Sequence, residues 1–240
     1  MAYSNCSQLY MLAEQIEPAI VWGNRALNLA ETIRDDGIIV HALTNIGSAE
    51  LLSGDEDGLA KLERALSMAQ EQEMHDHVAR CYANIASNAV MHRDYRAAER
   101  CLSQGIAYTT DRDMDSYSVY LRGWWARLRF EQGDWEEAVR CAEEVLRLTP
   151  GSAVIALPAV TTLGYVRMRQ GDAEASKWLD QARDMALPTG ELQRMGPVAA
   201  ALAEAAWWEG DRDRVLAEVA QVYELARRAG DAWQLGQIMV

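Results

Sequence analysis

Apolar residues recur along the chain with the period of an amphipathic helix, and a short turn interrupts this pattern at regular intervals. Residues 120–146 show the unit, which reads YLRGWWARLRFEQGDWEEAVRCAEEVL. Trp125, Leu128 and Phe130 precede a Gly-Asp pair, and Ala138 and further apolar residues follow it at helical spacing. The pattern therefore predicts two helices joined by a tight turn.

The same unit recurs along the whole chain, with a polar residue opening each second helix every 38 to 40 residues. A glycine precedes four of these residues, where it can end the first helix with a positive φ, and an aspartate can cap the second helix. Glu14 and Arg93 replace that glycine in two units, so we expect a strained or differently built turn there. The six opening residues, called turn residues below, are Gln15, Asp55, Asp94, Asp134, Asp172 and Asp211.

A fixed period in this range is typical of an α-solenoid, and the unit resembles the tetratricopeptide repeat (TPR), a helical pair of about 34 residues. The resemblance also rests on small residues eight positions before each turn residue, namely Ser7, Gly47, Ala86, Ala126, Gly164 and Ala203. It implies an all-α chain that forms a right-handed superhelix of about six TPR-like hairpins. We expect one repeat domain over residues 1–240, with hairpins at 2–33, 40–73, 79–112, 119–152, 157–190 and 196–229 and the start of a further helix at 232–240.

The prolines agree with this register. Pro18, Pro158 and Pro197 are predicted in the first turn of a helix, and Pro150 and Pro188 at the end of a hairpin, where a missing N–H costs least. The period exceeds the family's 34 residues by four to six. We expect the surplus in longer loops between hairpins or in one more turn of the second helices.

Three stretches, residues 2–27, 84–108 and 190–211, resemble the repeat region of large bacterial regulators. Those proteins combine an ATPase module, a TPR array and often a LuxR-type helix-turn-helix. The resemblance implies a signal-sensing or assembly role in transcription control. The sequence contains neither a GxxxxGK[ST] motif nor a basic helix-turn-helix, so ATP and DNA chemistry are not carried over.

The composition excludes some classes of binding partner. Acidic residues outnumber basic ones by 36 to 23, and the net charge of −13 argues against direct nucleic-acid binding. The chain contains neither a signal segment nor an apolar run of eighteen residues, so the sequence does not indicate a membrane partner. The four cysteines form no CxxC pair, which favours a reduced cytoplasmic protein, and we expect Cys101 and Cys141 to be core thiols. No cofactor or metal is expected, because His75-Asp-His77 is predicted in an inter-hairpin loop without a third ligand.

In TPR proteins the first helices line a concave groove, and polar residues on these helices predict the site. Asn5, Asn45 and Asn84 each lie ten residues before a turn residue, and a row of carboxamides can hold the backbone of an extended peptide. In the alternative interpretation these asparagines only bond neighbouring helices. The predicted ligand-binding groove consists of Asn5, Gln8, His41, Asn45, Arg80, Asn84, Ser87, Trp124, Arg127 and Tyr165.

Within this set, Arg80 and Arg127 are predicted to hold an acidic group of the ligand, and Trp124 ends the asparagine row. Tyr165, together with Trp207 and Trp208, predicts an aromatic C-terminal half of the groove. The first hypothesis is therefore a scaffold that binds a peptide or protein segment in a bacterial transcriptional regulatory system.

Two alternatives stay open. The first is a small-molecule or hydrolase-type pocket in the aromatic half. No GxSxG, HExxH or GxGxxG motif occurs, but a site assembled from scattered groove residues would leave no motif. The second is a self-association module. The chain begins inside a repeat and ends in a helix without a partner, so we expect either an excerpt of a longer array or a homo-oligomer formed through uncapped ends.

Overall fold

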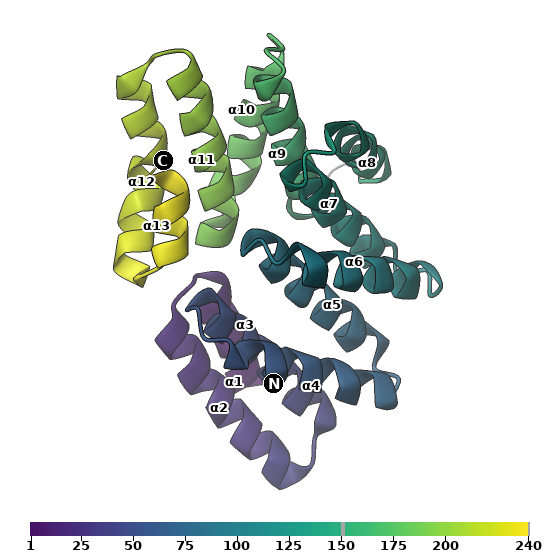
Figure 1. Ribbon diagram of the computed structural model, residues 1–240. Helices are drawn as coiled ribbons and strands as arrows, with labels where there is room; N and C mark the ends of the chain where they lie inside the picture. The colour runs from purple at the N-terminus through teal and green to yellow at the C-terminus, as the bar shows by residue number, and fades with distance from the viewer. Residues whose placement is uncertain (150–151, 240) are drawn as a thin grey trace. The chain divides into compact units, whose positions relative to one another are not determined.

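The computed structural model describes residues 1–149 and 152–239 (Figure 1). These residues are mostly helical and contain no β-strand, which confirms the predicted all-α array of TPR-like hairpins. They fold into two compact units, residues 1–117 (unit 1) and 118–240 (unit 2). None of the described helices combines the length and apolar character that crossing a bilayer requires.

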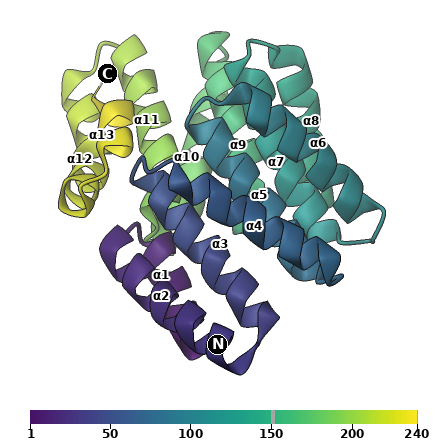
Figure 2. The ribbon, with the colours of Figure 1, turned by 60° about the horizontal axis from the view of Figure 1, so that its bottom comes forward.

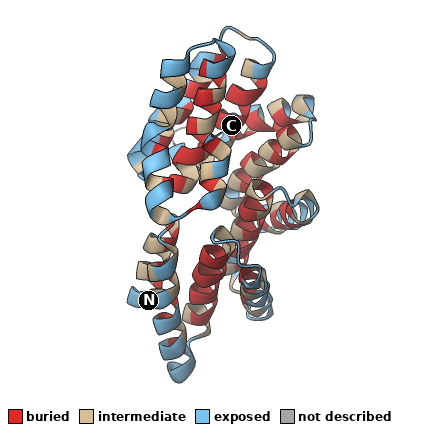
Figure 3. Cartoon of the chain, turned by 60° about the vertical axis from the view of Figure 1, so that its left-hand side comes forward, coloured by how far each residue is buried: buried red, intermediate tan, exposed pale blue. Residues whose placement is uncertain are grey.

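Unit 1 consists of three helical hairpins (Figure 2). Each later first helix packs against both helices of the hairpin before it, whereas the second helices contact only first helices extensively. The first helices therefore form one layer, in which α3 and α5 are more deeply buried than the second helices, and buried residues are red in Figure 3. The hairpins are α1 (Ala2–Leu12) with α2 (Ile16–Ile33), α3 (Asp36–Leu52) with α4 (Asp57–Glu71), and α5 (His75–Met91) with α6 (Tyr95–Thr110).

Unit 2 repeats this arrangement and adds one short helix at its end. Its core joins successive hairpins, because Ala126 on one first helix packs with Val145 on its second helix and with Leu163 on the next first helix. The elements are α7 (Asp115–Glu131), whose first three residues belong to unit 1, α8 (Trp135–Leu148), α9 (Ala153–Arg169), α10 (Ala175–Ala186), the 3-10 helix η1 (Leu187–Thr189), α11 (Leu192–Trp208), α12 (Arg212–Ala229) and α13 (Ala232–Ile238).

The turns within hairpins use the left-handed backbone region, as the glycine pattern predicts. The four turn glycines have positive φ angles, at 82° for Gly54, 83° for Gly133, 74° for Gly171 and 76° for Gly210. Glu14 and Arg93 adopt the same conformation with φ of 53° and 62°, although they carry a Cβ. A non-glycine residue in this region costs roughly 1–2 kcal/mol, so the predicted strain at these two turns is confirmed.

The turn aspartates also cap the second helices. The carboxylates of Asp94, Asp134 and Asp211 each accept a hydrogen bond from the backbone N–H three residues ahead, at 3.1, 3.2 and 3.0 Å. Asp55 and Asp172 instead accept from the N–H two residues ahead, and α4 and α10 begin later than the other second helices. The later starts of α4 and α10 thus accompany a different hydrogen bond of the same aspartate side chain.

The surplus residues of the repeat lie in the first helices, so both predicted locations are wrong. The helices α3, α5, α7, α9 and α11 each begin four residues before the predicted hairpin start, which adds about one helical turn. In α3 the reason is local, because Arg34 ends α2 with a φ of 58° and Asp35 then caps α3 by accepting from the Ile38 N–H at 3.0 Å. His75 and His77 likewise lie in the first turn of α5 and not in a loop.

The additional turn also moves two prolines. Pro158 and Pro197 are each the sixth residue of a helix, α9 and α11, and not part of its first turn as predicted. Each removes one helical hydrogen bond without ending the helix. Pro18 lies in the first turn of α2 and Pro188 in η1 directly after α10. Pro150 lies outside the described residues.

The short helix α13 packs on both α11 and α12. The Gln234 side chain, which is 2% exposed, fills the space beside Gly196 on α11. A Cβ at Gly196 would lie 2.0 Å from the Gln234 Oε1, so only glycine allows this approach. Ile238 completes the contact by joining the core of unit 2.

Candidate functional site

The first helices of unit 1 are linked by a chain of polar side chains centred on His41. The Ser4 hydroxyl on α1 lies 2.8 Å from Nδ1 of His41 on α3, and Nη1 of Arg80 on α5 lies 2.5 Å from Nε2. Because a guanidinium can only donate, Nε2 is the acceptor and the neutral ring carries its proton on Nδ1, which donates to Ser4. One imidazole therefore joins three successive first helices.

The surroundings of His41 keep it uncharged. Burial, the Arg80 guanidinium and the neighbouring His77 lower the pKa of His41 to about 4. The rings of the two histidines lie 6.1 Å apart, and burial and Arg80 also lower the pKa of His77. His41 is thus a neutral hydrogen-bonding bridge at neutral pH, and Arg80 supplies the positive charge at this place.

The predicted asparagine row is uneven. Asn45 is fully buried, and its Nδ2 donates to the backbone carbonyl of Ser4 on α1 at 3.0 Å. Asn5 is exposed and Asn84 is half-buried. Asn45 thus makes the helix-to-helix bond of the alternative interpretation, while the amides of Asn5 and Asn84 remain within reach of a ligand.

The remaining predicted residues of unit 1 differ in the same way. Gln8 is half-buried on α1. Ser87 is buried, and its hydroxyl donates to the Asn84 carbonyl within its own helix at 3.2 Å. Ser87 is therefore occupied by its own backbone, and Gln8 is the more accessible of the two.

In unit 2 the equivalent helix faces carry an aromatic pair. Phe130 on α7 and Tyr165 on α9 stack with ring centroids 5.1 Å apart and an interplanar angle of 27°. The guanidinium carbon of Arg127 lies 4.8 Å from the Tyr165 centroid, and that of Arg169 lies 5.0 Å from the Phe130 centroid. The structure therefore brings the predicted residues Arg127 and Tyr165 together through a cation–π contact.

Two glutamates hold these arginines in place. Arg127 donates to Glu131 through Nε at 2.8 Å, and Arg169 donates to Glu204 on α11 through Nε at 2.8 Å and Nη2 at 3.0 Å. The Arg127 and Arg169 side chains are 18% and 38% exposed. The Nη1 group of neither arginine bonds another described residue, so both can still donate to an anionic or carbonyl group.

Tyr165 is enclosed by its neighbours. It is 5% exposed, burial raises the pKa of its hydroxyl, and that hydroxyl donates to the Pro197 carbonyl on α11 at 3.3 Å. Trp207 and Trp208 are each 65% exposed and contact each other with centroids 5.2 Å apart. Tyr165 is thus part of the packing between first helices, and the two tryptophans are surface residues at the end of α11.

Trp124 is half-buried on α7 and meets Tyr120 edge to face at 6.4 Å. Its indole N–H is buried and interacts with the Tyr120 hydroxyl, whose pKa is raised by burial and lowered by the hydrogen bond with Trp124. Trp124 therefore belongs to the packing of α7.

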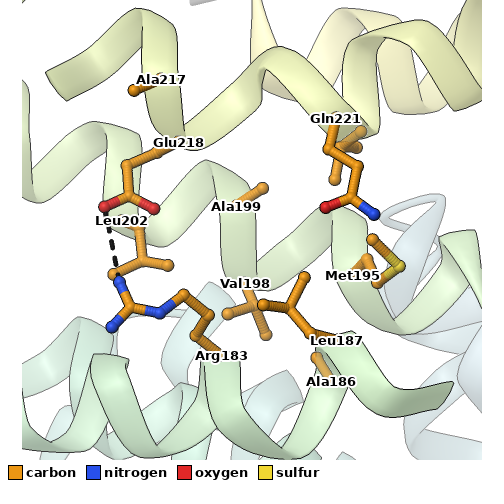
Figure 4. A pocket seen from close by; sticks show the side chains of 11 residues that line it. Arg183, Ala186, Leu187, Met195, Val198, Ala199, Leu202, Ala217, Glu218 and Gln221 are labelled. Atoms are coloured by element: carbon orange, nitrogen blue, oxygen red, sulfur yellow. Dashed lines mark ion pairs between the residues drawn. The ribbon is translucent and has the colours of Figure 1, made fainter. Parts of the chain in front are cut away.

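A cavity of about 200 Å³ lies elsewhere in unit 2, between α10, α11 and α12 (Figure 4). Its floor is aliphatic, with Val198 and Leu202 among the lining residues. Gln221 and the ion pair between Arg183 and Glu218, at 3.6 Å, provide its polar side chains. The cavity is smaller than the roughly 300–1,000 Å³ typical of drug-sized ligand sites.

The buried thiols are held in their protonated form. Burial raises the pKa of the Cys81 thiol to about 11 and that of Cys141 to about 12, which keeps both protonated. Cys101 is also buried, so the predicted core thiols Cys101 and Cys141 are confirmed. Within residues 1–149 and 152–239 no cluster of three metal-ligating side chains occurs, and His75 pairs with the Tyr108 hydroxyl at 2.7 Å.

Sequence reasoning missed Phe130, Glu131, Arg169 and Glu204. The signal was available, because Glu204 lies seven residues before its turn residue, as Arg127 and Tyr165 do, and Arg169 lies three residues before its own. These positions share one helix face. A comparison of the residues on that face in neighbouring repeats, and not only of the residues at the asparagine position, identifies these arginines, glutamates and aromatic rings.

No protein-family model matches the sequence, and no curated protein matches it. Among solved structures, the chain is similar to a Rap protein complexed with competence and sporulation factor, with a TM-score of 0.70 and 14% sequence identity. The match covers 93% of this chain and 62% of the Rap chain. At this identity the likeness supports the TPR-like helical fold and leaves the function to other arguments.

Proposed function

We propose that this chain is a scaffold that binds a peptide or protein segment along the exposed faces of its first helices. The observation that best supports the proposal is the pair of arginines, Arg127 and Arg169, held over Phe130 and Tyr165 by glutamates. A guanidinium fixed in this way loses little further freedom on binding, so its remaining N–H donors are preorganised for a ligand carboxylate or carbonyl.

Taken by itself, unit 1 offers donors of a different kind. Arg80 is half-buried and carries a charge, and the Asn5 and Asn84 amides can both donate and accept. An extended peptide presents one carbonyl and one N–H per residue, which matches carboxamides better than it matches charged groups. Asn45 is left out of this set because its amide already bonds the Ser4 carbonyl.

The Rap protein supports the same proposal by analogy of fold, since it is seen in complex with competence and sporulation factor. We further propose that the ligand of this chain is a signal in a bacterial transcriptional regulatory system. That step rests on the resemblance of residues 2–27, 84–108 and 190–211 to the repeat region of LuxR-type regulators.

Selection from a randomised peptide library tests the binding proposal. Selected peptides should bind about tenfold more weakly to Arg127→Gln and to Arg169→Gln, because each variant removes a charge-assisted donor. Arg64→Gln is the matched control, because Arg64 lies on α4 with its side chain 56% exposed. Helix content by circular dichroism should stay unchanged in all three variants. Failure to select any peptide, or equal binding by all variants, would refute the proposal.

Capture from the native source tests the regulatory step separately. A component of transcription control should be retained by the wild-type chain and lost with Arg127→Gln. Retention of only unrelated proteins would leave peptide binding intact and remove the regulatory role.

The small-molecule or hydrolase alternative has weaker support. Tyr165 is packed between helices, Trp207 and Trp208 are exposed on the surface, and the cavity found lies away from the aromatic pair. A thermal-shift screen of metabolites and generic esters would reveal it through stabilisation or turnover that the peptide variants do not change.

A further inference from the structure

The cavity between α10, α11 and α12 lies in a groove whose counterpart in the preceding repeat is filled by an aromatic side chain. The second helices can be aligned by their buried residues, which match at a constant offset of 40 positions: Ala182 with Val222 and Ala186 with Ala226. Trp178 on α10 therefore has the place that Glu218 has on α12.

Trp178 fills the groove between α8 and α10. Its side chain packs against the buried cluster that contains Val145 on α8 and Leu163 on α9. Leu146 on α8 packs against the same cluster. An aromatic and an aliphatic side chain thus occupy this groove.

In the next groove an ion pair replaces these two side chains. Val145 on α8 corresponds to Ala182 on α10, since each is fully buried and lies three residues after another fully buried residue. The residues that follow them, Leu146 and Arg183, therefore occupy equivalent places. Nη1 of Arg183 lies 3.6 Å from the Glu218 carboxylate, and a cavity of about 200 Å³ remains beside the pair.

The cavity has the lining and the size for one aromatic ring system. Val198 and Leu202 form an aliphatic floor on α11, and Leu187, which is 44% exposed, adds an apolar side chain that a ligand would cover (Figure 4). An aliphatic cavity of about 150 Å³ is enough to bind benzene. The larger volume here therefore fits a two-ring system the size of the Trp178 indole.

Glu218 provides an unused hydrogen-bond acceptor beside this space. Its side chain is 15% exposed, and Nη1 of Arg183 and Nε of Arg214 each lie 3.6 Å from its Oε1. This distance is too long for a hydrogen bond, and Glu218 accepts none from the part of the chain that the structure describes. A carboxylate largely shielded from water gains most from a ligand that donates an N–H.

We propose that this cavity binds a small planar heteroaromatic molecule of the indole class. The ring lies over Val198 and Leu202, and its N–H donates to the Glu218 carboxylate. None of the residues that line the cavity belongs to the proposed peptide-binding set, so this is a second and independent site. The occupant is a free molecule, and the tryptophan side chain of a partner, which has the same ring chemistry, is distinguished from it by the test below.

Calorimetric titration of the full chain with indole tests the proposal. The wild-type chain should bind indole saturably, and N-methylindole, which lacks the N–H, should bind about tenfold more weakly. Glu218→Trp should weaken indole binding at least about tenfold, because the new side chain fills the cavity as Trp178 fills the preceding groove. Glu224→Trp is the matched control, because Glu224 lies on α12 outside the cavity with its side chain 48% exposed.

Ala217→Leu is a second variant that keeps the ion pair. Ala217 lines the cavity and is exposed, so a larger side chain there occupies part of the space without entering the core. Helix content by circular dichroism should stay unchanged in all variants. If Glu218→Trp loses helix content, Ala217→Leu alone decides.

Binding that is weakened in the cavity variants and kept in Glu224→Trp supports the site. No saturable binding of indole by the wild type overturns it, as does binding that is unchanged in the cavity variants or lost equally in the control. Equal affinities for indole and N-methylindole overturn the contact with Glu218. If a tryptophan-containing peptide binds, free indole does not, and Glu218→Trp abolishes the peptide binding, the occupant is a partner's side chain and the free-molecule assignment is overturned.

Discussion

The first helices of the two units are joined by different chemistry, at different positions of the repeat. In unit 1 a buried imidazole, a hydroxyl and a buried carboxamide join α1, α3 and α5 through hydrogen bonds. In unit 2 stacked rings and arginine–glutamate pairs join α7, α9 and α11. The comparison teaches that the repeat sets which helices meet, whereas the individual side chains decide where along the helices, and by which interactions, they are joined.

The turns of the two units differ as well. All five non-glycine residues with positive φ lie in unit 1: Glu14, Arg34, Glu73, Arg93 and Asp113. In the described part of unit 2 every residue with positive φ is a glycine. Unit 1 thus carries backbone strain at its turns, whereas unit 2 carries the greater chain entropy of glycine in its unfolded state.

Tyr165→Ala should show the largest effect and tests the aromatic contact of unit 2. The change removes the partner of Phe130 and leaves a cavity, which costs about 3–5 kcal/mol. Tyr165→Phe loses only the hydrogen bond to the Pro197 carbonyl, at about 1 kcal/mol. Urea unfolding followed by circular dichroism measures both, and similar losses in the two variants would mean that the hydroxyl, not the ring, holds the helices.

The hydrogen-bonded bridge of unit 1 should respond to pH. The pKa of His41 is about 4 in the folded protein against 6.5 as its ordinary value, so the unfolded chain binds more protons between these pH values. Stability is therefore fully present above pH 6.5 and falls as the pH drops towards 4. The loss should reach roughly 3 kcal/mol, and His77 contributes with the same sign.

His41→Gln removes that titration and serves as the comparison. Its unfolding free energy should change less with pH than that of the wild type over the same window. An identical pH dependence of the two proteins would show that His41 and Arg80 do not form the bridge in solution.

Asn45 and Asn84 should differ in how much their replacement by alanine lowers the stability of the protein. Asn45→Ala leaves the Ser4 carbonyl without its donor in a buried position, at a cost of about 1–3 kcal/mol. Asn84 is half-buried, so Asn84→Ala should stay within about 0.5 kcal/mol. Thermal unfolding of the two variants separates a structural from an accessible asparagine. Equal losses would place both amides in the packing.

Substitutions at the turns should change the free energy of unfolding least, with opposite signs in the two units. Arg93→Gly removes the strain of a side chain at a positive φ in unit 1. After the entropic cost of the added glycine is subtracted, the variant should be more stable than the wild type by about 0.5 kcal/mol. Gly133→Ala should destabilise unit 2 by about 1 kcal/mol through its φ alone, since no atom lies near the added Cβ. The same sign in both variants would contradict the interpretation of the turns.

The sequence predicts the hairpins and their turns because glycine and aspartate act locally, within a few residues. It does not predict the additional turn of the first helices, because the start of a first helix depends on where the preceding helix ends, as Arg34 and the Asp35 cap show between α2 and α3. The site is only partly predictable for a related reason. Asn5, Asn45 and Asn84 occupy the same repeat position, yet they are exposed, buried and half-buried, because the side chains around each amide differ.

The space beside Gly196, which the Gln234 side chain fills, has a consequence for the last helix. With only seven residues, α13 is too short to persist by its own backbone hydrogen bonds. A shift of one residue would withdraw the Gln234 amide from the single place where α11 lacks a Cβ and press a differently shaped side chain against the helix. The alignment of the carboxyl-terminal helix thus depends on one missing methyl group, and Gly196→Ala should force the Gln234 amide to move away from α11.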